Sequence, residues 1–139
     1  MIKDIVPSDY EAELASNAYI MSLVSIIAGF PLPFFNLLAT VIFFLLNRKQ
    51  SYFVRWHTTQ AMLSQLIVFF INSFGFWWTI SIIFWDEKLS IPYILYLSFI
   101  LIFNIIELIA TIYAAIETRK GQHSQWWVLG GITSLLCKP

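Results

Sequence analysis

The residues best equipped for chemistry gather in one short stretch, SYFVRWHTTQA at positions 51–61, between two long apolar runs. Within it, Arg55 could bind an anion, His57 could exchange a proton near neutral pH, and Gln60 could both donate and accept hydrogen bonds. Catalysis is not expected, because no serine or cysteine nucleophile stands at a plausible spacing with a histidine and an acid. His123 is the only other histidine, and two histidines make a poor metal set. We therefore predict an interaction or structural motif of Arg55, His57 and Gln60, without a catalytic, metal-binding or cofactor-binding role.

His57 itself has two interpretations. The first is a capping or interfacial histidine that bonds a loop carbonyl or Gln60, and the second is a pH sensor, because histidine titrates near neutrality. The basic residues around it, Arg48, Lys49 and Arg55, are most simply topology determinants, with anionic lipid binding as the alternative.

Glu107 is the second candidate for chemistry, being ionisable and close to the middle of an apolar run. Polar side chains at bilayer depth are costly towards lipid and turn towards protein or water. At a helical period of about 100° per residue, one face of the helix expected at 52–85 carries His57, Gln60, Ser64, Gln65, Asn72 and Gly75. One face of the helix expected at 93–118 carries Asn104, Glu107, Thr111 and Thr118. The two faces predict a polar seam between helices, with Gly75 and Ala115 allowing close approach. Glu107 could be hydrogen-bonded between helices, a proton or cation site, or a contact with a partner subunit. The predicted seam consists of Gln65, Asn72, Asn104 and Glu107.

The composition indicates an integral membrane protein of one domain, residues 1–139. Of its residues, 59% are hydrophobic and only 12% are charged, whereas soluble domains carry about 25% charged residues. The formal net charge is zero, which argues against nucleic acid as a partner. The single cysteine excludes an internal disulfide.

Three apolar blocks, at 18–46, 61–85 and 93–116, set the expected helices. The first block is broken by GFPLP at 29–33, where glycine suits a helix end and proline the start of the next helix. Ser8 and Glu11 form a capping box at the expected start of the first helix. The arm 33–47 would reach only about 22 Å, less than a hydrocarbon core of about 30 Å, so it must thin the bilayer, pack inside the bundle or be re-entrant. We predict helices at about 9–29, 33–47, 52–85 and 93–118, and an interfacial tail at 122–139.

Lysine and arginine set the orientation, because they are enriched in cytoplasmic loops. They concentrate at 47–60 and after the last apolar block, whereas the turn at 86–92 holds Lys88 beside two acids. The fold class is therefore an all-α, four-helix transmembrane bundle with a Gly/Pro-broken first hairpin and both termini in the cytoplasm. One kinked first span would instead give three spans and an external N-terminus.

The stretch SYFVRWHTTQAM resembles the signature of a widespread family of small bacterial membrane proteins of unknown function. That family is related to the twenty-kilodalton Tic subunit of chloroplast inner-envelope protein import. GFPLPFFNLLATVIFFLLNRKQ and YAAIETRKGQHSQWWVLGGI resemble its broken first hairpin and its closing helix with an aromatic tail. The resemblance implies four membrane helices with both termini inside, and a link to protein translocation. The positions that match its central pattern are Ser51, Phe53, Val54, Arg55, Trp56, His57, Gln60 and Ala61.

These observations predict a non-enzymatic subunit of a larger assembly in the bacterial cytoplasmic (inner) membrane. Its partners would be membrane lipids and another integral membrane protein or a second copy of itself. The alternative is a small homo-oligomeric channel or transporter built on the seam around Glu107. A third hypothesis is a lipid-binding or membrane-shaping protein.

Overall fold

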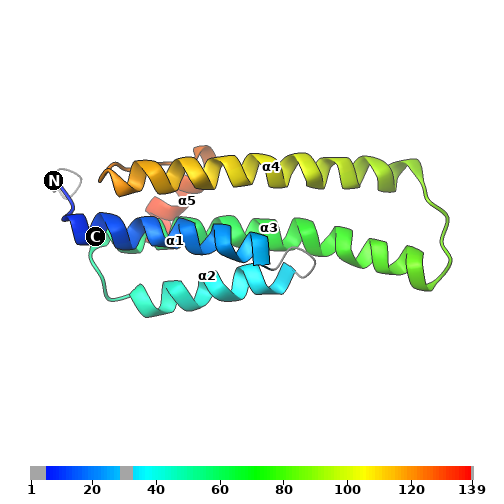
Figure 1. Cartoon of the computed structure of the whole chain (residues 1–139), viewed down its shortest axis with the longest axis horizontal. Helices are drawn as coiled ribbons and strands as arrows, with labels where there is room; N and C mark the ends of the chain where they lie inside the picture. Colours follow the sequence, from blue (N-terminus) through cyan, green and yellow to red (C-terminus); the bar gives the residue numbers. More distant parts are fainter. Residues whose placement is uncertain (1–5, 29–32, 139) are drawn as a thin grey trace.

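The computed structural model describes residues 6–28 and 33–138, and this part of the chain forms five α-helices and no strand (Figure 1). The helices are α1 (Asp9–Ala28), α2 (Pro33–Asn47), α3 (Tyr52–Phe84), α4 (Ile91–Arg119) and α5 (Trp127–Leu136). The all-helical prediction is confirmed, and the first four helices lie close to their predicted positions. The tail predicted only as interfacial contains a fifth helix. Most of the predicted break at 29–33 lies outside the described residues.

Local signals explain where α1 and α4 begin. The backbone N–H of Ser8 donates to the Glu11 carboxylate at 2.8 Å, and the N–H of Glu11 donates to Ser8 Oγ at 3.3 Å, as the capping box predicts. At the start of α4, Ser90 Oγ accepts from the N–H of Tyr93 at 3.3 Å. The helix therefore starts before the apolar block that begins at Tyr93, because Ser90 caps it.

The capping box makes the stability of the first turn of α1 depend on pH. The Ser8 backbone N–H, helped by serine side chains, holds the pKa of Glu11 below its usual range. A carboxylate of this kind stabilises the fold above its unfolded pKa of about 4.3, and the stabilisation is lost as the pH falls through the lowered folded value. We expect hydrogen-exchange protection of the first turn of α1, corrected for intrinsic rates, to fall on acidification below about pH 4. Glu11→Gln should remove most of this dependence, and an unchanged pH profile would contradict the assignment.

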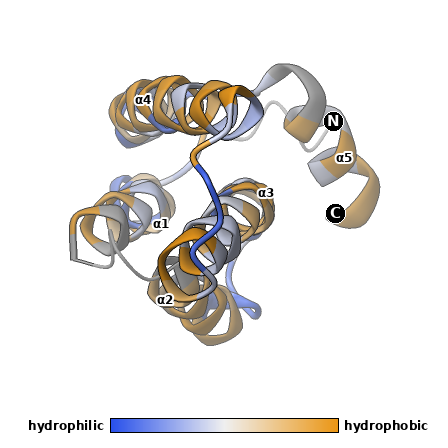
Figure 2. Ribbon diagram, turned by 90° about the vertical axis from the view of Figure 1, so that its right-hand side faces the viewer, coloured by the Kyte–Doolittle hydropathy of each residue, from blue (hydrophilic) through white to orange (hydrophobic). Residues whose placement is uncertain are grey.

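The helices differ in length, and the short ones lie beside only part of the long ones (Figure 1). At about 1.5 Å per residue, α3 is about 50 Å long and α4 about 44 Å, against about 30 Å for α1 and about 22 Å for α2. Seen along the helices, α4, α1, α3 and α2 lie next to one another in turn, and α5 lies beside α3 (Figure 2).

Side-chain contacts fix the level at which the short helices end. Ser16 of α1 donates to the carbonyl of Ala115 in α4 at 2.8 Å, and α1 continues for about 18 Å beyond it. The ring of Phe34, at the start of α2, lies 5.5 Å from the ring of Phe69 in α3. Twelve residues back from Ala115 along α4, the end of α1 lies about level with Asn104, near the middle of that helix. The start of α2 lies close to the same level, because Phe69 is one turn from Asn72, the partner of Asn104. Beyond that level, α3 and α4 continue as a pair of helices.

Two of the described helices, α3 and α4, are long and apolar enough to cross a membrane. In α2 only the shorter apolar stretch Leu37–Asn47 stands out. A bundle of four full membrane spans is therefore not confirmed, although the helix order is as predicted. Large apolar side chains cover the outer surfaces of α3 and α4, including Phe74, Trp77, Leu95 and Ile102, each at least half exposed. This surface suits lipid as its solvent.

Candidate functional site

A hydrogen-bonded chain of three fully buried side chains joins α1 to α3. Gln60 Nε2 donates to Tyr19 Oη at 2.8 Å, and Tyr19 Oη lies 2.7 Å from His57 Nδ1. Gln60 Nε2 also donates to the carbonyl of Ser124 at 2.9 Å, while its Oε1 accepts from the N–H of Trp126 at 3.3 Å. These backbone partners fix the orientation of the amide. Tyr19 Oη therefore accepts a hydrogen bond from Gln60 and forms a second one with His57 Nδ1.

The other ring nitrogen of His57, Nε2, lies among aromatic rings. Nε2 is buried and makes no hydrogen bond within the described part of the chain. The ring of His123 lies 5.0 Å away, and Phe53 and Trp56 pack edge-on against both imidazoles. We call the group of Tyr19, His57, Gln60, Ser124 and Trp126 the polar cap.

The polar cap differs from the predicted motif in two ways. His57 was expected to bond a loop carbonyl or Gln60, but its partner is Tyr19, since α1 packs against this face of α3. Arg55 lies apart from the cap, because it projects from another side of α3 and donates to the carbonyl of Lys138 at 3.4 Å. Nothing in the sequence marked Tyr19 as a partner of His57, apart from its hydroxyl and its place on a helix face of small residues. Ala15 and Ala18 on that face are also buried.

The predicted seam is present in part. Asn72 and Asn104 exchange two hydrogen bonds, at 3.0 and 2.8 Å. Glu107 accepts from Ser64 Oγ, and the carbonyl of Glu107 accepts from Thr111 at 2.7 Å. Gln65 does not join: it is buried, but neither polar atom of its side chain has a hydrogen-bond partner among the described residues. Its neighbour Ser64 reaches Glu107 instead, because adjacent residues on a helix point about 100° apart.

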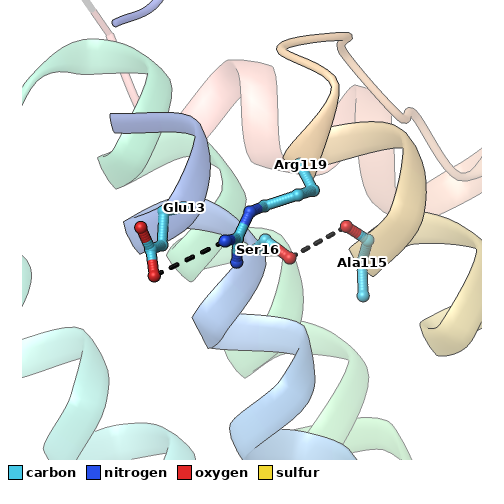
Figure 3. A network of polar contacts seen from close by, with 4 residues as sticks. All are labelled: Glu13, Ser16, Ala115 and Arg119. Atoms are coloured by element: carbon cyan, nitrogen blue, oxygen red, sulfur yellow. Dashed lines mark hydrogen bonds and ion pairs between the residues drawn. The ribbon is translucent and has the colours of Figure 1, made fainter. Parts of the chain in front are cut away.

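The two small residues expected in the seam have different neighbours. A Cβ at Gly75 would lie 2.2 Å from Cδ1 of Ile100, so glycine does allow α3 and α4 to approach closely. Ala115 faces α1, where its carbonyl accepts from Ser16; Arg119 pairs with Glu13 at 3.6 Å one turn further along (Figure 3). The close approach predicted at Ala115 involves α1 as well as α3, because the buried cluster around Ala115 contains Ala18 and Tyr19 of α1 beside Ala61 of α3.

Gly75→Ala should be less stable than Gly131→Ala by about 1 kcal/mol, because overpacking offsets the helix propensity gained. At Gly131, the matched control, an added Cβ meets nothing within 4 Å. Thermal unfolding of both variants in the same detergent tests the difference. Equal stabilisation of the two variants would contradict close packing at Gly75.

Neither group of polar residues is a multi-ligand metal site. Within residues 6–28 and 33–138, no cluster of three or more histidine, cysteine, aspartate or glutamate side chains could hold a metal ion. The polar cap and the seam instead place hydrogen bonds between helices, where they satisfy polar groups that would otherwise be costly in lipid.

The family model of the magnetosome magnetite crystal formation proteins (MamF/MmsF) matches residues 14–131. The chain belongs to this family. The match to MamF/MmsF extends from α1 into α5 and therefore includes the whole polar cap and the seam. No curated protein and no solved structure matches the chain.

The MamF/MmsF match overturns the predicted membership of the family related to the twenty-kilodalton Tic subunit. That resemblance was carried mainly by residues 51–61, a small fraction of the region that the MamF/MmsF model covers. Three positions of this stretch, Trp56, His57 and Gln60, are buried and anchor α3 to other segments. A short pattern of this kind therefore records a packing requirement and does not identify the family.

Proposed function

We propose that this chain is a non-enzymatic membrane protein that supports magnetite crystal formation in a magnetosome membrane. The observation that carries the proposal is the MamF/MmsF family match over residues 14–131. The non-enzymatic assignment is supported by the polar cap, where His57 Nδ1 and both ends of the Gln60 amide are engaged in interhelical bonds. In this proposal the protein is a structural component, anchored in a membrane derived from the bacterial cytoplasmic membrane.

Complementation tests the proposed role. A magnetite-forming bacterium that lacks its own member of the family would be given this chain, and crystal number and size would be measured by electron microscopy. We expect restoration towards normal crystals by the wild-type chain. Normal membrane levels of the protein without any change in the crystals would overturn the proposal.

For the membrane arrangement, we propose two full spans, α3 and α4, and a re-entrant α1–α2 hairpin that enters from the cytoplasmic side. The hairpin ends about level with Asn104, near the middle of the apolar part of α4. Its outer surface is apolar, with Ile27 77% and Leu38 54% exposed, which suits hydrocarbon. Arg48, Lys49 and Arg119 lie at the end that carries the polar cap, so that end, with the start of α1 and the end of α5, faces the cytoplasm in this proposal.

Labelling with a membrane-impermeant maleimide tests this arrangement in a Cys137→Ser background. We expect Glu87→Cys to react from the outside and Lys49→Cys to react only from the cytoplasmic side. Ile27→Cys should react from neither side, because it would lie in hydrocarbon. Labelling of Ile27→Cys from the outside would support four full spans instead.

We also propose that the chain binds a partner in the membrane, either another integral membrane protein or a second copy of itself. The outer halves of α3 and α4, which α1 and α2 do not cover, offer a lateral surface for it. Native mass spectrometry after gentle extraction should find a stoichiometric complex. A bare monomer in repeated preparations would count against a stable partner.

The channel alternative has weaker support, because Glu107 accepts from Ser64 and the two asparagines of the seam pair with each other. If Glu107 only joins helices, Glu107→Gln should leave the ion or proton flux across liposome membranes at the wild-type level. A flux present in the wild type and abolished in Glu107→Gln would establish the alternative.

Membrane shaping is a second candidate function, favoured by the unequal helix lengths. On the polar-cap side of Asn104 the protein has four packed helices and α5, whereas beyond it only α3 and α4 continue. Such a wedge occupies more area in the cytoplasmic leaflet and favours membranes that are convex towards the cytoplasm. We expect enrichment of the protein in small vesicles over large ones of the same lipid. Equal partitioning of the protein between small and large vesicles would contradict a membrane-shaping function.

A further inference from the structure

A cleft of about 250 Å³ opens at the polar-cap end of the molecule, between the end of α2, the start of α3 and the end of α5. Its walls include the apolar side chains of Phe44, Met62 and Leu136. Three basic residues line the same cleft: Arg48, Arg55 and Lys138. They come from three separate segments, so only the folded chain brings them together.

The cleft is lined by positive charge that no described residue neutralises. None of its described lining residues is acidic, and none of its three cations forms an ion pair with a described side chain. The guanidinium of Arg55 donates to the carbonyl of Lys138 at 3.4 Å, which holds the end of α5 against α3. This bond holds the backbone of Lys138 beside the cleft.

The depth of the cleft matches the boundary between headgroups and acyl chains. Arg48 follows the end of α2 and Arg55 lies in the first turn of α3, whereas Met62 lies at the start of the apolar block of that helix. The basic residues therefore lie about 10 Å nearer the aqueous phase than Met62, measured along α3. A phosphate at the cations would leave an acyl chain beside Phe44, Met62 and Leu136.

We propose that this cleft binds one anionic phospholipid from the cytoplasmic leaflet, with its phosphate held by Arg48, Arg55 and Lys138. Arginine suits this task because its planar fork of N–H donors matches phosphate oxygens. Basic pockets beside membrane helices on the cytoplasmic side bind anionic headgroups in the same way. The apolar wall selects a lipid over a free phosphate ion. The inference rests on the membrane orientation proposed above but not on a role in crystal formation.

Native mass spectrometry of the full chain in mild detergent tests the proposal, with phosphatidylglycerol or phosphatidylcholine added in equal amounts. We expect one phosphatidylglycerol to bind at least about tenfold more tightly than phosphatidylcholine, because both lipids carry the phosphate but the choline cation is repelled by the three basic side chains. Arg48→Gln should reduce this preference about fivefold or more. Arg48 is chosen because it is exposed, whereas Arg55→Gln would also release the end of α5.

Lys49→Gln is the matched control, because it removes the same charge from the neighbouring residue, which does not line the cleft. The proposal is supported if Lys49→Gln keeps the preference and Arg48→Gln loses it. Equal losses in the two variants would overturn it in favour of diffuse attraction. Displacement of the lipid by a modest excess of inorganic phosphate would also overturn it, since the site would then recognise a free anion.

Discussion

Gln60→Leu is expected to lower the free energy of unfolding by about 3–5 kcal/mol, which is the largest effect among the substitutions considered. The leucine fills a similar volume but removes every hydrogen bond of the amide. It leaves the hydroxyl of Tyr19, the carbonyl of Ser124 and the N–H of Trp126 short of a partner inside the fold. Each such buried group costs about 1–3 kcal/mol when unsatisfied, and the losses are not additive.

The effect should be local as well as global. Segment 124–126 is tied to α3 through Gln60, and α5 follows it directly. We expect hydrogen exchange in residues 124–136 to accelerate in Gln60→Leu before the rest of the protein unfolds. Thermal unfolding in detergent gives the global loss, and exchange measured by mass spectrometry gives the local one.

Gln122→Leu is the matched control for Gln60→Leu. The side chain of Gln122 is exposed and makes no hydrogen bond to another described residue, so the same substitution should change stability by less than about 0.5 kcal/mol. A Gln60→Leu protein as stable as this control would mean that the polar cap does not hold α1, α3 and segment 124–126 together.

The second large effect is expected in the seam. Asn72→Leu should destabilise the protein by about 1–2 kcal/mol, because it leaves the Asn104 amide without its partner between α3 and α4. Asn104→Leu should cost a similar amount. The double variant should recover most of the loss, since replacing both partners with apolar groups leaves no unsatisfied amide.

The asparagine cycle is measured by unfolding the four proteins in mixed micelles. A recovery in the double variant would assign Asn72 and Asn104 to interhelical packing. Additive losses would contradict a direct pair. Recovered stability with lost complementation of crystal formation would show that the amides serve a function beyond packing.

Much of this architecture follows from local sequence patterns. The apolar blocks located α3 and α4, because a run of apolar residues of this length favours a helix in lipid. Ser8 and Glu11 located the start of α1 through contacts only three residues apart. Gly75 was recognised as a close approach because only glycine lacks the Cβ that would collide with a neighbouring helix.

Those local patterns could not show which residues contact each other between helices. Helical periodicity identifies the polar face of a helix, but not which neighbouring helix that face meets. It therefore could not select Tyr19 as the partner of His57, Ser64 over Gln65 as the partner of Glu107, or α1 as the neighbour of Ala115.

The sequence by itself determined an all-helical membrane protein with a basic, polar end, because composition, periodicity and caps act over a few residues. Only the tertiary structure decided that α1 and α2 lie beside half of the α3–α4 pair, and that Arg48, Arg55 and Lys138 line one cleft. Those features depend on the relative depth of whole helices. Depth is set by the sum of contacts between residues far apart in the chain, such as Ser16 with Ala115 and Phe34 with Phe69.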